Sequence, residues 1–477
     1  MKTILFTFSI LHAPREMLPV VEYFLSRNWR VTVLLSFYGA VADETERRCL
    51  AMGAAVYRTP RAFAYVQSDK PGEKSAPATA TERPRRKKFQ KLRRLANAVL
   101  SAISYYTIIA KQKKYASALL NKVSADAIVC NNFQSCGKID DVFLHMIHKR
   151  RIPAFCVLCS PLVGKKISQR GRLNHLEFGM LPPETATGFD FLTRLTAKFF
   201  PQWTFGNTTG RVFLFDPILL LAAKWAGILP ADIWQCPSTL FRRVFIHNEI
   251  SQSILEQSGF PMDKVVVSGP PRLDPIFQSL AAPAFVKSFW EQLGSNEPEP
   301  YVLWNIEPSF EHNYATKEKH WENFYQIYNC LKEANVRTIL SLHPLCTLEN
   351  YIFVESDSRF TISRTHGIEI LYPFCQFALS FPCSTNIYAK YFNKQLIIYD
   401  WSGMRKKTAY FEEFHLSCGA SLVSTTDELT KTVQAMMTKT THTGPDAFLS
   451  SQGNKNASCT IYDSIEKYIE APHHELP

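Results

Sequence analysis

The chain has 477 residues, of which 46% are hydrophobic, and a net charge of +12 from 54 Lys and Arg against 42 Asp and Glu. This length predicts two or three domains with ample core, and the apolar fraction is ordinary for a globular protein. No stretch reaches the ~18–20 uncharged apolar residues of a spanning helix, which excludes a bundle of membrane helices. The closest stretch runs from Val212 to Leu229 and is interrupted by Asp216 and Lys224. It predicts a core helix or a helix on a membrane surface.

Alternating strand and helix patterns fill the first sixty residues. Ile4–Ser9 predicts a first strand, Leu18–Arg27 a helix and Arg30–Leu35 a second strand. Asp43–Met52 predicts another helix, and residues 54–60 a third strand. The apolar start resembles a signal peptide, but no small-residue cleavage site follows it, so we expect it to be the first strand of the fold. The alternation predicts an α/β domain.

A basic insertion interrupts this alternation at about residues 61–115. Between Arg83 and Arg94, eight of twelve residues are Lys or Arg, and a basic helix is expected from about Lys88 to Leu120. Charge of this density suits a polyanion: an anionic membrane surface, a phosphorylated acceptor or nucleic acid. A solvated charge run on a loop is the other interpretation. Phe89 is the only aromatic residue of this run, so few bases could stack on it, and nucleic acid is the least favoured of these partners.

Twelve cysteines are scattered along the chain without a disulfide framework. Cys156 and Cys159 have the spacing of a zinc or redox site, but they lie inside the apolar run IPAFCVLCS. No second Cys or His pair completes a metal site, so we interpret the run as a buried strand. Reduced thiols indicate a cytoplasmic protein.

Two polar motifs follow buried strands in the second half. VRTILSLHP leads an apolar run into His343-Pro344, and FALSFPCSTN leads another into Ser384-Thr385-Asn386. Ligands of open α/β sheets bind at the carboxyl ends of strands. A hydroxyl pair that opens a helix can hold a phosphate, and a neighbouring imidazole adds a donor or a stacking face. The motifs therefore predict a nucleotide site, although Ser384 as a plain N-cap and His343 as an ordinary loop histidine are the alternatives.

The expected domain organisation follows from these patterns. Residues 1–280 form an N-terminal Rossmann-like acceptor domain, 281–300 a linker and 301–440 a nucleotide-sugar-binding domain. Residues 441–477 form a polar tail with a terminal helix, Thr460–Glu470, that packs back on the first domain. The predicted fold class is α/β, with two Rossmann-like domains facing a central cleft.

At this point the chain resembles the GT-B glycosyltransferase superfamily. The order of motifs in the second half is similar to that of bacterial sialyltransferases and CDP-glycerol glycerophosphotransferases, which carry an HP motif and then a hydroxyl pair. Here His343 and Ser384 lie 41 residues apart. VVVSGPPRLDPI is similar to an element of surface-carbohydrate transferases and of UDP-N-acetylglucosamine 2-epimerase relatives. The resemblance covers about residues 242–402 by motif and the first half by architecture.

The resemblance implies roles for the second-half motifs. The histidine of His343-Pro344 would contact the nucleotide, and Ser384, Thr385 and Asn386 would bind its phosphate. This chain has Cys383-Ser384-Thr385 where the families have a Ser-Ser pair. The hydroxyls are kept, but the identity of the donor stays open.

Three further residues have implied roles, and the first two, Gly269 and Arg272, would line the cleft. Gly269 would permit close backbone approach, and Arg272 would neutralise phosphate charge. An ion pair with Asp274 or Glu307 is the alternative for Arg272. Glu369 would hold a ribose hydroxyl, or it is a solvated acid at a helix start.

An inverting transferase needs a general base for the acceptor hydroxyl. His12, on the loop after the first strand, is the first choice because many GT-B enzymes place a catalytic histidine there, and Glu16 is the alternative. The paired acids of sialyltransferases have no clear copy at the matching place, which puts a sialyl donor in question. No Asp-x-Asp motif stands at a strand end, so we expect catalysis without metal or cofactor, and a nucleotide-sugar as co-substrate.

The leading hypothesis is a cytoplasmic glycosyltransferase that is peripheral on the inner membrane face. It would move a sugar from a nucleotide donor, with a CMP-linked sugar as one candidate, to a cell-surface glycan or lipid-linked acceptor. One alternative is a UDP-sugar 2-epimerase-like enzyme, although the acids expected after the IVCNN strand are missing. The other is a non-enzymatic basic protein, binding membrane or nucleic acid, on a degenerate GT-B scaffold.

Overall fold

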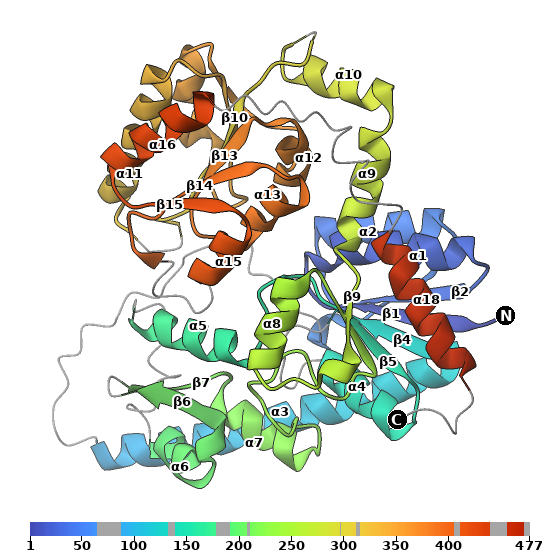
Figure 1. Ribbon diagram of the computed structural model, residues 1–477. Helices are drawn as coiled ribbons and strands as arrows, with labels where there is room; N and C mark the ends of the chain where they lie inside the picture. Colours follow the sequence, from blue (N-terminus) through green and yellow to red (C-terminus); the bar gives the residue numbers. More distant parts are fainter. Residues whose placement is uncertain are drawn as a thin grey trace. The chain divides into compact units, whose positions relative to one another are not determined.

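The computed structural model describes residues 1–63, 87–131, 139–177, 191–207, 210–295, 297–311, 315–404, 411–438 and 456–471 (Figure 1). The chain divides into two compact units. Unit 1 comprises residues 1–159, 163–271 and 457–477, and unit 2 comprises 160–162 and 272–456. Each unit is described by itself.

Unit 1 contains a seven-stranded parallel sheet in the order β3-β2-β1-β4-β5-β8-β9. Every residue of β1 is buried, as expected of a strand with helices on both faces, and β2 has the bounds that its sequence predicted. A separate hairpin, β6-β7, is antiparallel. The strands are β1 (Thr3–Phe8), β2 (Arg30–Leu35), β3 (Ala55–Arg58), β4 (Ala127–Cys130), β5 (Ala154–Val157), β6 (Thr204–Asn207), β7 (Gly210–Phe213), β8 (Arg243–Ile246) and β9 (Val265–Val267).

Helix α18 lies far along the sequence but belongs to unit 1, where it packs on α1 (Figure 1). The ring centroids of Phe24 and Tyr462 are 4.9 Å apart, and Trp29 Nε1 donates to Tyr462 Oη at 3.4 Å. The helices of unit 1 are α1 (Ala13–Ser26), α2 (Ala40–Ala51), α3 (Lys87–Val123), α4 (Ile139–Lys149), α5 (Lys165–Glu177), α6 (Phe191–Phe199), α7 (Pro217–Trp225), α8 (Glu249–Gln257) and α18 (Ala457–Glu470).

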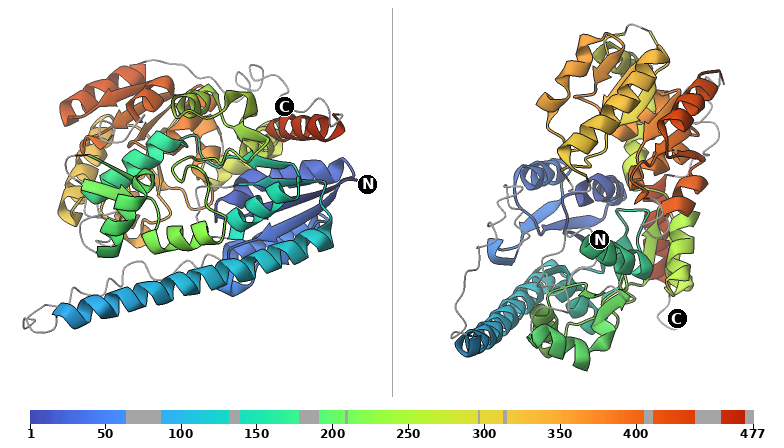
Figure 2. Two further views of the ribbon diagram at one scale, coloured as in Figure 1. Left: turned by 90° about the horizontal axis from the view of Figure 1, so that it is seen from below. Right: turned by 90° about the vertical axis from the view of Figure 1, so that its left-hand side faces the viewer.

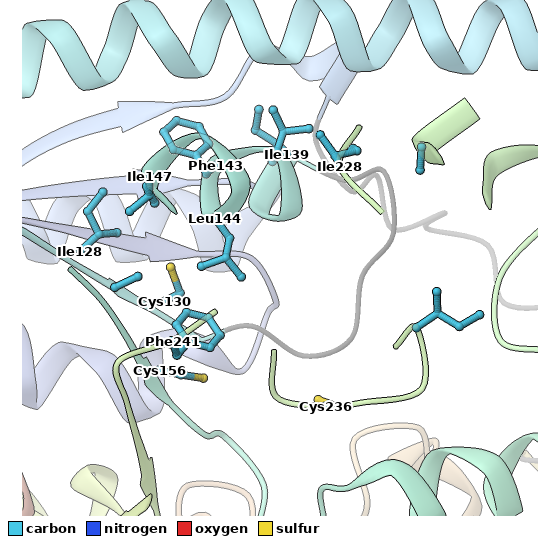
Figure 3. Packing of buried hydrophobic residues seen from close by; sticks show 14 of the residues in the cluster. Ile128, Cys130, Ile139, Phe143, Leu144, Ile147, Cys156, Ile228, Cys236 and Phe241 are labelled. Atoms are coloured by element: carbon cyan, nitrogen blue, oxygen red, sulfur yellow. The ribbon is translucent and has the colours of Figure 1, made fainter. Parts of the chain in front are cut away.

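Cysteines contribute to the core between the sheet and helices α3, α4 and α7 (Figure 3). Cys130 and Cys156 are buried beside Ile128, Phe143 and Ile147, and burial raises the pKa of the Cys130 thiol to about 12. No disulfide joins the cysteines within the described ranges. The interpretation of this run as a buried strand is confirmed for Cys156, which belongs to β5, whereas Cys159 lies two residues past β5 and is half-buried.

Unit 2 contains a six-stranded parallel sheet in the order β12-β11-β10-β13-β14-β15. The strands are β10 (Val302–Asn305), β11 (Thr338–Ser341), β12 (Phe360–Ile362), β13 (Phe377–Ser380), β14 (Gln395–Tyr399) and β15 (Ala420–Val423). The helices are α9 (Asp274–Leu280), α10 (Pro283–Gln292), α11 (Lys317–Glu333), α12 (Ile368–Leu371), α13 (Ile387–Tyr391), α15 (Phe411–Ser417) and α16 (Thr426–Thr438). The predicted α/β class with two Rossmann-like sheets is thus confirmed.

The division between the units falls at Pro271–Arg272 instead of in a linker at 281–300. Residues 283–292 form helix α10, which buries Phe289 and Trp290. Phe289 stacks on Phe374 with centroids 4.1 Å apart, and this aromatic packing attaches the segment to unit 2.

Two other segments differ in detail from expectation. The apolar stretch from Val212 is not one helix: it completes β7 and then forms α7, whose Leu220 is buried in the unit 1 core. The basic helix of the insertion, α3, starts at Lys87 and runs to Val123, while residues 64–86 lie outside the described ranges. Figure 2 shows α3 as the long helix whose first turns run clear of the unit 1 sheet.

Candidate functional site

The strand order of unit 2 creates one position where neighbouring loops diverge. The chain moves from β10 to β11 and β12 on one side, and then returns to β13 on the other side of β10 before it continues to β14 and β15. Loops that follow β10 and β13 therefore leave in opposite directions. In open α/β sheets, ligands bind at the carboxyl ends of strands beside such a switch point.

A row of polar residues marks the carboxyl ends of three adjacent strands. β10 ends at Asn305, β11 at Ser341 and β13 at Ser380, and all three side chains are buried. Asn305 pairs with Ser341, while Trp304 pairs with Leu379, so that Asn305 and Ser380 follow side by side. The residues immediately before these three, Trp304, Leu340 and Leu379, are apolar. The polar side chains therefore start where the strands end and the loops begin.

The Asn305 amide connects β10 to the predicted hydroxyl motif. Its Nδ2 donates to Ser380 Oγ at 3.1 Å, and it lies 3.5 Å from Thr385 Oγ1 and 3.6 Å from Cys383 Sγ. The Cys383 thiol is itself 3.1 Å from Thr385 Oγ1. Amide and hydroxyl donors gathered at a switch point can bind a phosphate.

The loop after β13 is held by hydrogen bonds at both ends. Asn386 is fully buried and donates from Nδ2 to Phe381 O at 2.7 Å, so it shapes the loop rather than facing solvent. Cys383 N donates to Nε2 of the buried His415, on α15, at 3.2 Å. Ser384 and Thr385 are half-buried in a 3₁₀ turn, η10 (Ser384–Asn386), that leads into the short α13. The hydroxyl pair thus opens a 3₁₀ turn that continues directly into the five-residue helix α13.

His343 and Pro344 occupy the loop after β11. His343 is half-buried, and its Nδ1 accepts from Leu345 N at 3.2 Å, so the neutral ring carries its proton on Nε2. Cys346 N donates to His343 O at 2.8 Å and closes the turn, while Pro344 is exposed. Because β11 and β13 both flank β10, the two predicted motifs follow strands on either side of Asn305.

Three buried side chains and the half-buried Cys346 join the loop after β10 to the loop of His343. Tyr351 Oη donates to Cys346 Sγ at 3.8 Å, so its oxygen accepts from His320 Nε2 at 3.0 Å. His320 therefore accepts at Nδ1 from Ser309 Oγ, at 2.7 Å. Burial lowers the pKa of His320 to about 4, which keeps the ring neutral as this assignment requires. We call Ser309, His320, Tyr351 and Cys346 the relay.

Glu307 lies two residues beyond β10 and lines a small cavity of about 30 Å³ together with Asn305, Ser380 and Trp401. Trp401 Nε1 donates to its Oε2 at 3.0 Å. Burial raises the pKa of Glu307 to about 7, against the lowering effect of this hydrogen bond, and the charge of Asp400 adds to the rise. This acid can therefore take up or release a proton near neutral pH.

Arg272 and Glu369 complete the predicted residues of unit 2. The Arg272 guanidinium lies over the ring of Tyr388, on α13, 5.1 Å from its centroid. Glu369 is in the first turn of α12, and its carboxylate folds back on Gly367, where an added Cβ would come within 2.8 Å of Oε2. That position matches the helix-start alternative, and the ribose contact stays a prediction.

Unit 1 has a comparable switch point between β1 and β4. Asn131, which follows β4, accepts at Oδ1 from Ser9 N at 3.0 Å and from Ser9 Oγ at 3.1 Å. These residues hold the loop that follows β1 and leads to His12.

The two candidate bases of unit 1 have different surroundings. His12 is exposed at the residue before α1. Glu16 is buried in α1, and its Oε1 is 3.8 Å from Nε2 of the equally buried His247, whose Nε2 is also 2.9 Å from Leu158 O. Gly269 follows β9 with φ of +84°, a conformation that favours glycine.

Three expectations concern metals, membranes and the basic run. Within the described ranges, no group of three or more His, Cys, Asp or Glu side chains could hold a metal ion. In the same ranges, no helix combines the length and apolar character needed to cross a bilayer. Of the run from Arg83 to Arg94, residues 83–86 and the side chains of 87–94 lie outside what the structure describes.

Sequence reasoning missed Asn305 and Glu307 as site residues. The segment YVLWNIEPSF was expected to open the second domain, but Glu307 entered only as an ion-pair partner of Arg272. A polar residue at the end of an apolar strand is the signal that could have identified Asn305. His415 and His247 gave no signal, because each meets its partner only through the tertiary fold.

No protein-family model matches the chain, and no curated protein matches it in sequence. Solved structures do resemble it. UDP-GlcNAc 2-epimerase from Neisseria meningitidis, bound to UDP-GlcNAc, matches with a TM-score of 0.51 and 12% identity over 98% of this chain and 100% of that one. The UDP-GlcNAc 2-epimerase of Methanocaldococcus jannaschii gives 0.50 and 13% over 98% and 100%, and a Rickettsia africae glycosyltransferase gives 0.50 and 11% over 98% and 97%. This likeness establishes that the chain has the GT-B fold.

Proposed function

We propose that this protein is a glycosyltransferase that binds a nucleotide-activated sugar at the carboxyl ends of β10, β11 and β13. The observation that carries the proposal is the Asn305 amide, which joins Ser380 and Thr385 at the switch point of unit 2. Its fold is also that of solved glycosyltransferases.

The proposed donor site uses the predicted residues in distinct roles. Ser384 and Thr385 hold the donor phosphate, and Arg272 offsets its charge. His343 donates from Nε2 to the nucleotide. A CMP-linked sugar is the first donor to test, because the HP and hydroxyl motifs resemble those of cytidine-dependent families.

The proposed reaction is an inverting transfer without metal. A base takes the proton of an acceptor hydroxyl, the oxygen attacks the anomeric carbon, and the bond to the donor phosphate breaks, so that the nucleotide leaves with both electrons. His12 is the proposed base, and its exposure suits a group that meets an acceptor. The acceptor would be a cell-surface glycan or a lipid-linked sugar, reached by a protein peripheral to the membrane.

A binding panel tests the proposal. Purified protein is heated with CMP, CDP, UDP, GDP or ADP, and a ligand at 100 times its Kd adds about 2.7 kcal/mol to the stability. We expect a shift with a cytidine nucleotide that His343→Ala and Ser384→Ala both remove while the variants remain folded. Stabilisation by UDP would indicate a UDP-linked donor in place of a CMP-linked one. Conversion of UDP-GlcNAc without an acceptor would identify an epimerase instead. A chain that binds none of the five would contradict the proposal.

A further inference from the structure

Helix α3 carries a stripe of apolar side chains that face solvent. Val99, Leu100, Ile103 and Tyr106 expose 51%, 64%, 55% and 45% of their surface. Their spacing of one, three and three residues places them on one side of the helix. Elsewhere in the described ranges, no helix exposes more than two large apolar side chains in this way.

A different side of α3 packs against the rest of unit 1. Ile109, Ala116 and Leu120 are buried in the unit 1 core, where α3 lies against α4 and α7. The exposed stripe is therefore a second apolar face, separate from the one that joins the helix to its unit. Isolated exposed apolar residues are ordinary, but a continuous stripe marks an interaction surface.

The positive charge of α3 indicates which kind of partner this surface binds. From Lys87 to Val123 the helix has nine Lys and Arg residues and no Asp or Glu. Lys111 and Lys114 are exposed, and they lie eight and eleven residues after Ile103, which continues the same side of the helix. The surface thus combines aliphatic and aromatic contact with positive charge.

We propose that the exposed side of α3, formed by Val99, Leu100, Ile103, Tyr106, Lys111 and Lys114, binds an anionic lipid surface. The apolar stripe enters the boundary between headgroups and acyl chains, and the lysines pair with lipid phosphates. A second copy of the chain is a poor partner, because two such helices would repel each other. Nucleic acid would use the lysines but leave the aliphatic stripe in water. The inference does not depend on the proposed catalysis.

Vesicle cosedimentation of the full chain tests this surface. We expect binding to phosphatidylcholine vesicles that contain phosphatidylglycerol and weak binding to pure phosphatidylcholine. The double variant Leu100→Glu/Ile103→Glu removes apolar contact and adds repulsion, and it should lower partitioning at least about tenfold. Lys111→Glu/Lys114→Glu, which leaves the stripe intact, should lower binding and its dependence on salt.

The matched control is Leu50→Glu, on α2 of the same unit, where the side chain is 55% exposed. It should bind vesicles like the wild type. Circular dichroism and nucleotide-induced stabilisation should be unchanged in all variants, which separates a failure here from a failure of the donor site. Wild-type protein that ignores anionic vesicles would overturn the proposal, and so would stripe variants that bind normally, or that change only self-association or RNA binding.

Discussion

Trp401 and Glu307 are joined by a 3.0 Å hydrogen bond from the indole Nε1 to the carboxylate Oε2. The bond connects the residue two positions past β14 with the residue two positions past β10, at the ends of strands that are separated by β13. It favours the charged carboxylate, while burial and Asp400 favour the protonated acid. The balance leaves Glu307 with a pKa of about 7.

This balance predicts a pH-dependent stability. Between the ordinary pKa of 4.5 and about 7, folded Glu307 keeps a proton that the unfolded chain has released, so stability falls as pH rises through this window. The glutamine of Glu307→Gln resembles the protonated acid and does not titrate. The free energy of unfolding of this variant, relative to that of the wild type, should therefore be higher by about 1–3 kcal/mol at pH 8 than at pH 5. Denaturant titrations at several pH values measure it.

Trp401→Phe supplies the control for this prediction. Loss of the indole donor should raise the pKa of folded Glu307 further, so the fall in stability should begin at the same pH and extend to higher pH. Parallel stability curves for the wild type and Glu307→Gln between pH 5 and pH 8 would show that Glu307 does not titrate in this range.

The relay predicts a link between a buried hydroxyl and nucleotide affinity. Tyr351→Phe leaves His320 Nε2 and the Cys346 thiol without their shared partner, which should cost about 1–3 kcal/mol of stability. Since Cys346 also closes the turn of His343, we expect the affinity for the stabilising nucleotide to fall several-fold as well. Isothermal titration calorimetry gives the Kd.

Tyr301→Phe is the matched control for the relay. Tyr301 is also buried, and its Oη donates to Leu371 O at 2.6 Å, but it is not part of the relay. Loss of this hydroxyl should reduce the free energy of unfolding, while the Kd for the nucleotide stays at the wild-type value. If Tyr351→Phe and Tyr301→Phe both bind the nucleotide with the wild-type Kd, the relay stabilises the fold but does not affect nucleotide affinity.

Thr385→Val tests the hydroxyl beside Asn305. The change keeps the shape of the side chain and removes the hydroxyl proposed to bind the donor phosphate, so the nucleotide Kd should rise about tenfold, equivalent to about 1.4 kcal/mol. Thr430→Val is the comparison, because its hydroxyl on α16 contacts Cys330 of α11 instead. If both variants bind nucleotide equally well, Thr385 is not a donor ligand.

His12 and Glu16 should respond differently to substitution. His12→Gln changes an exposed side chain, so turnover should fall by about 10²–10⁴-fold with little change in melting temperature. Glu16→Gln disturbs the buried pair with His247 and should lower stability by about 1–3 kcal/mol. Release of nucleotide from the donor gives the turnover. The reverse pattern would make Glu16 the better candidate base.

The sequence predicts elements best where strands are buried on both faces. Such strands are continuous apolar runs, so β2 and the strands that lead into His343 and Ser384 could be located without a structure. Asn305 could not be assigned a role, because its importance comes from β10 lying beside β13, about 75 residues later. Glu16 is a similar case, since His247 lies on a distant segment. Contacts between segments far apart in the sequence decide both roles, and local periodicity carries no information on such contacts.

The return of α18 to unit 1 affects how the protein is made. Tyr462 and Ile465 fill the core beside α1, but they are synthesised after the whole of unit 2. A ribosome-bound chain therefore carries an unfinished first unit, with the apolar surface of α1 uncovered, while the second unit is still being translated. Unit 1 can complete its core only when α18 has left the ribosome, so the part that begins first is among the last to finish.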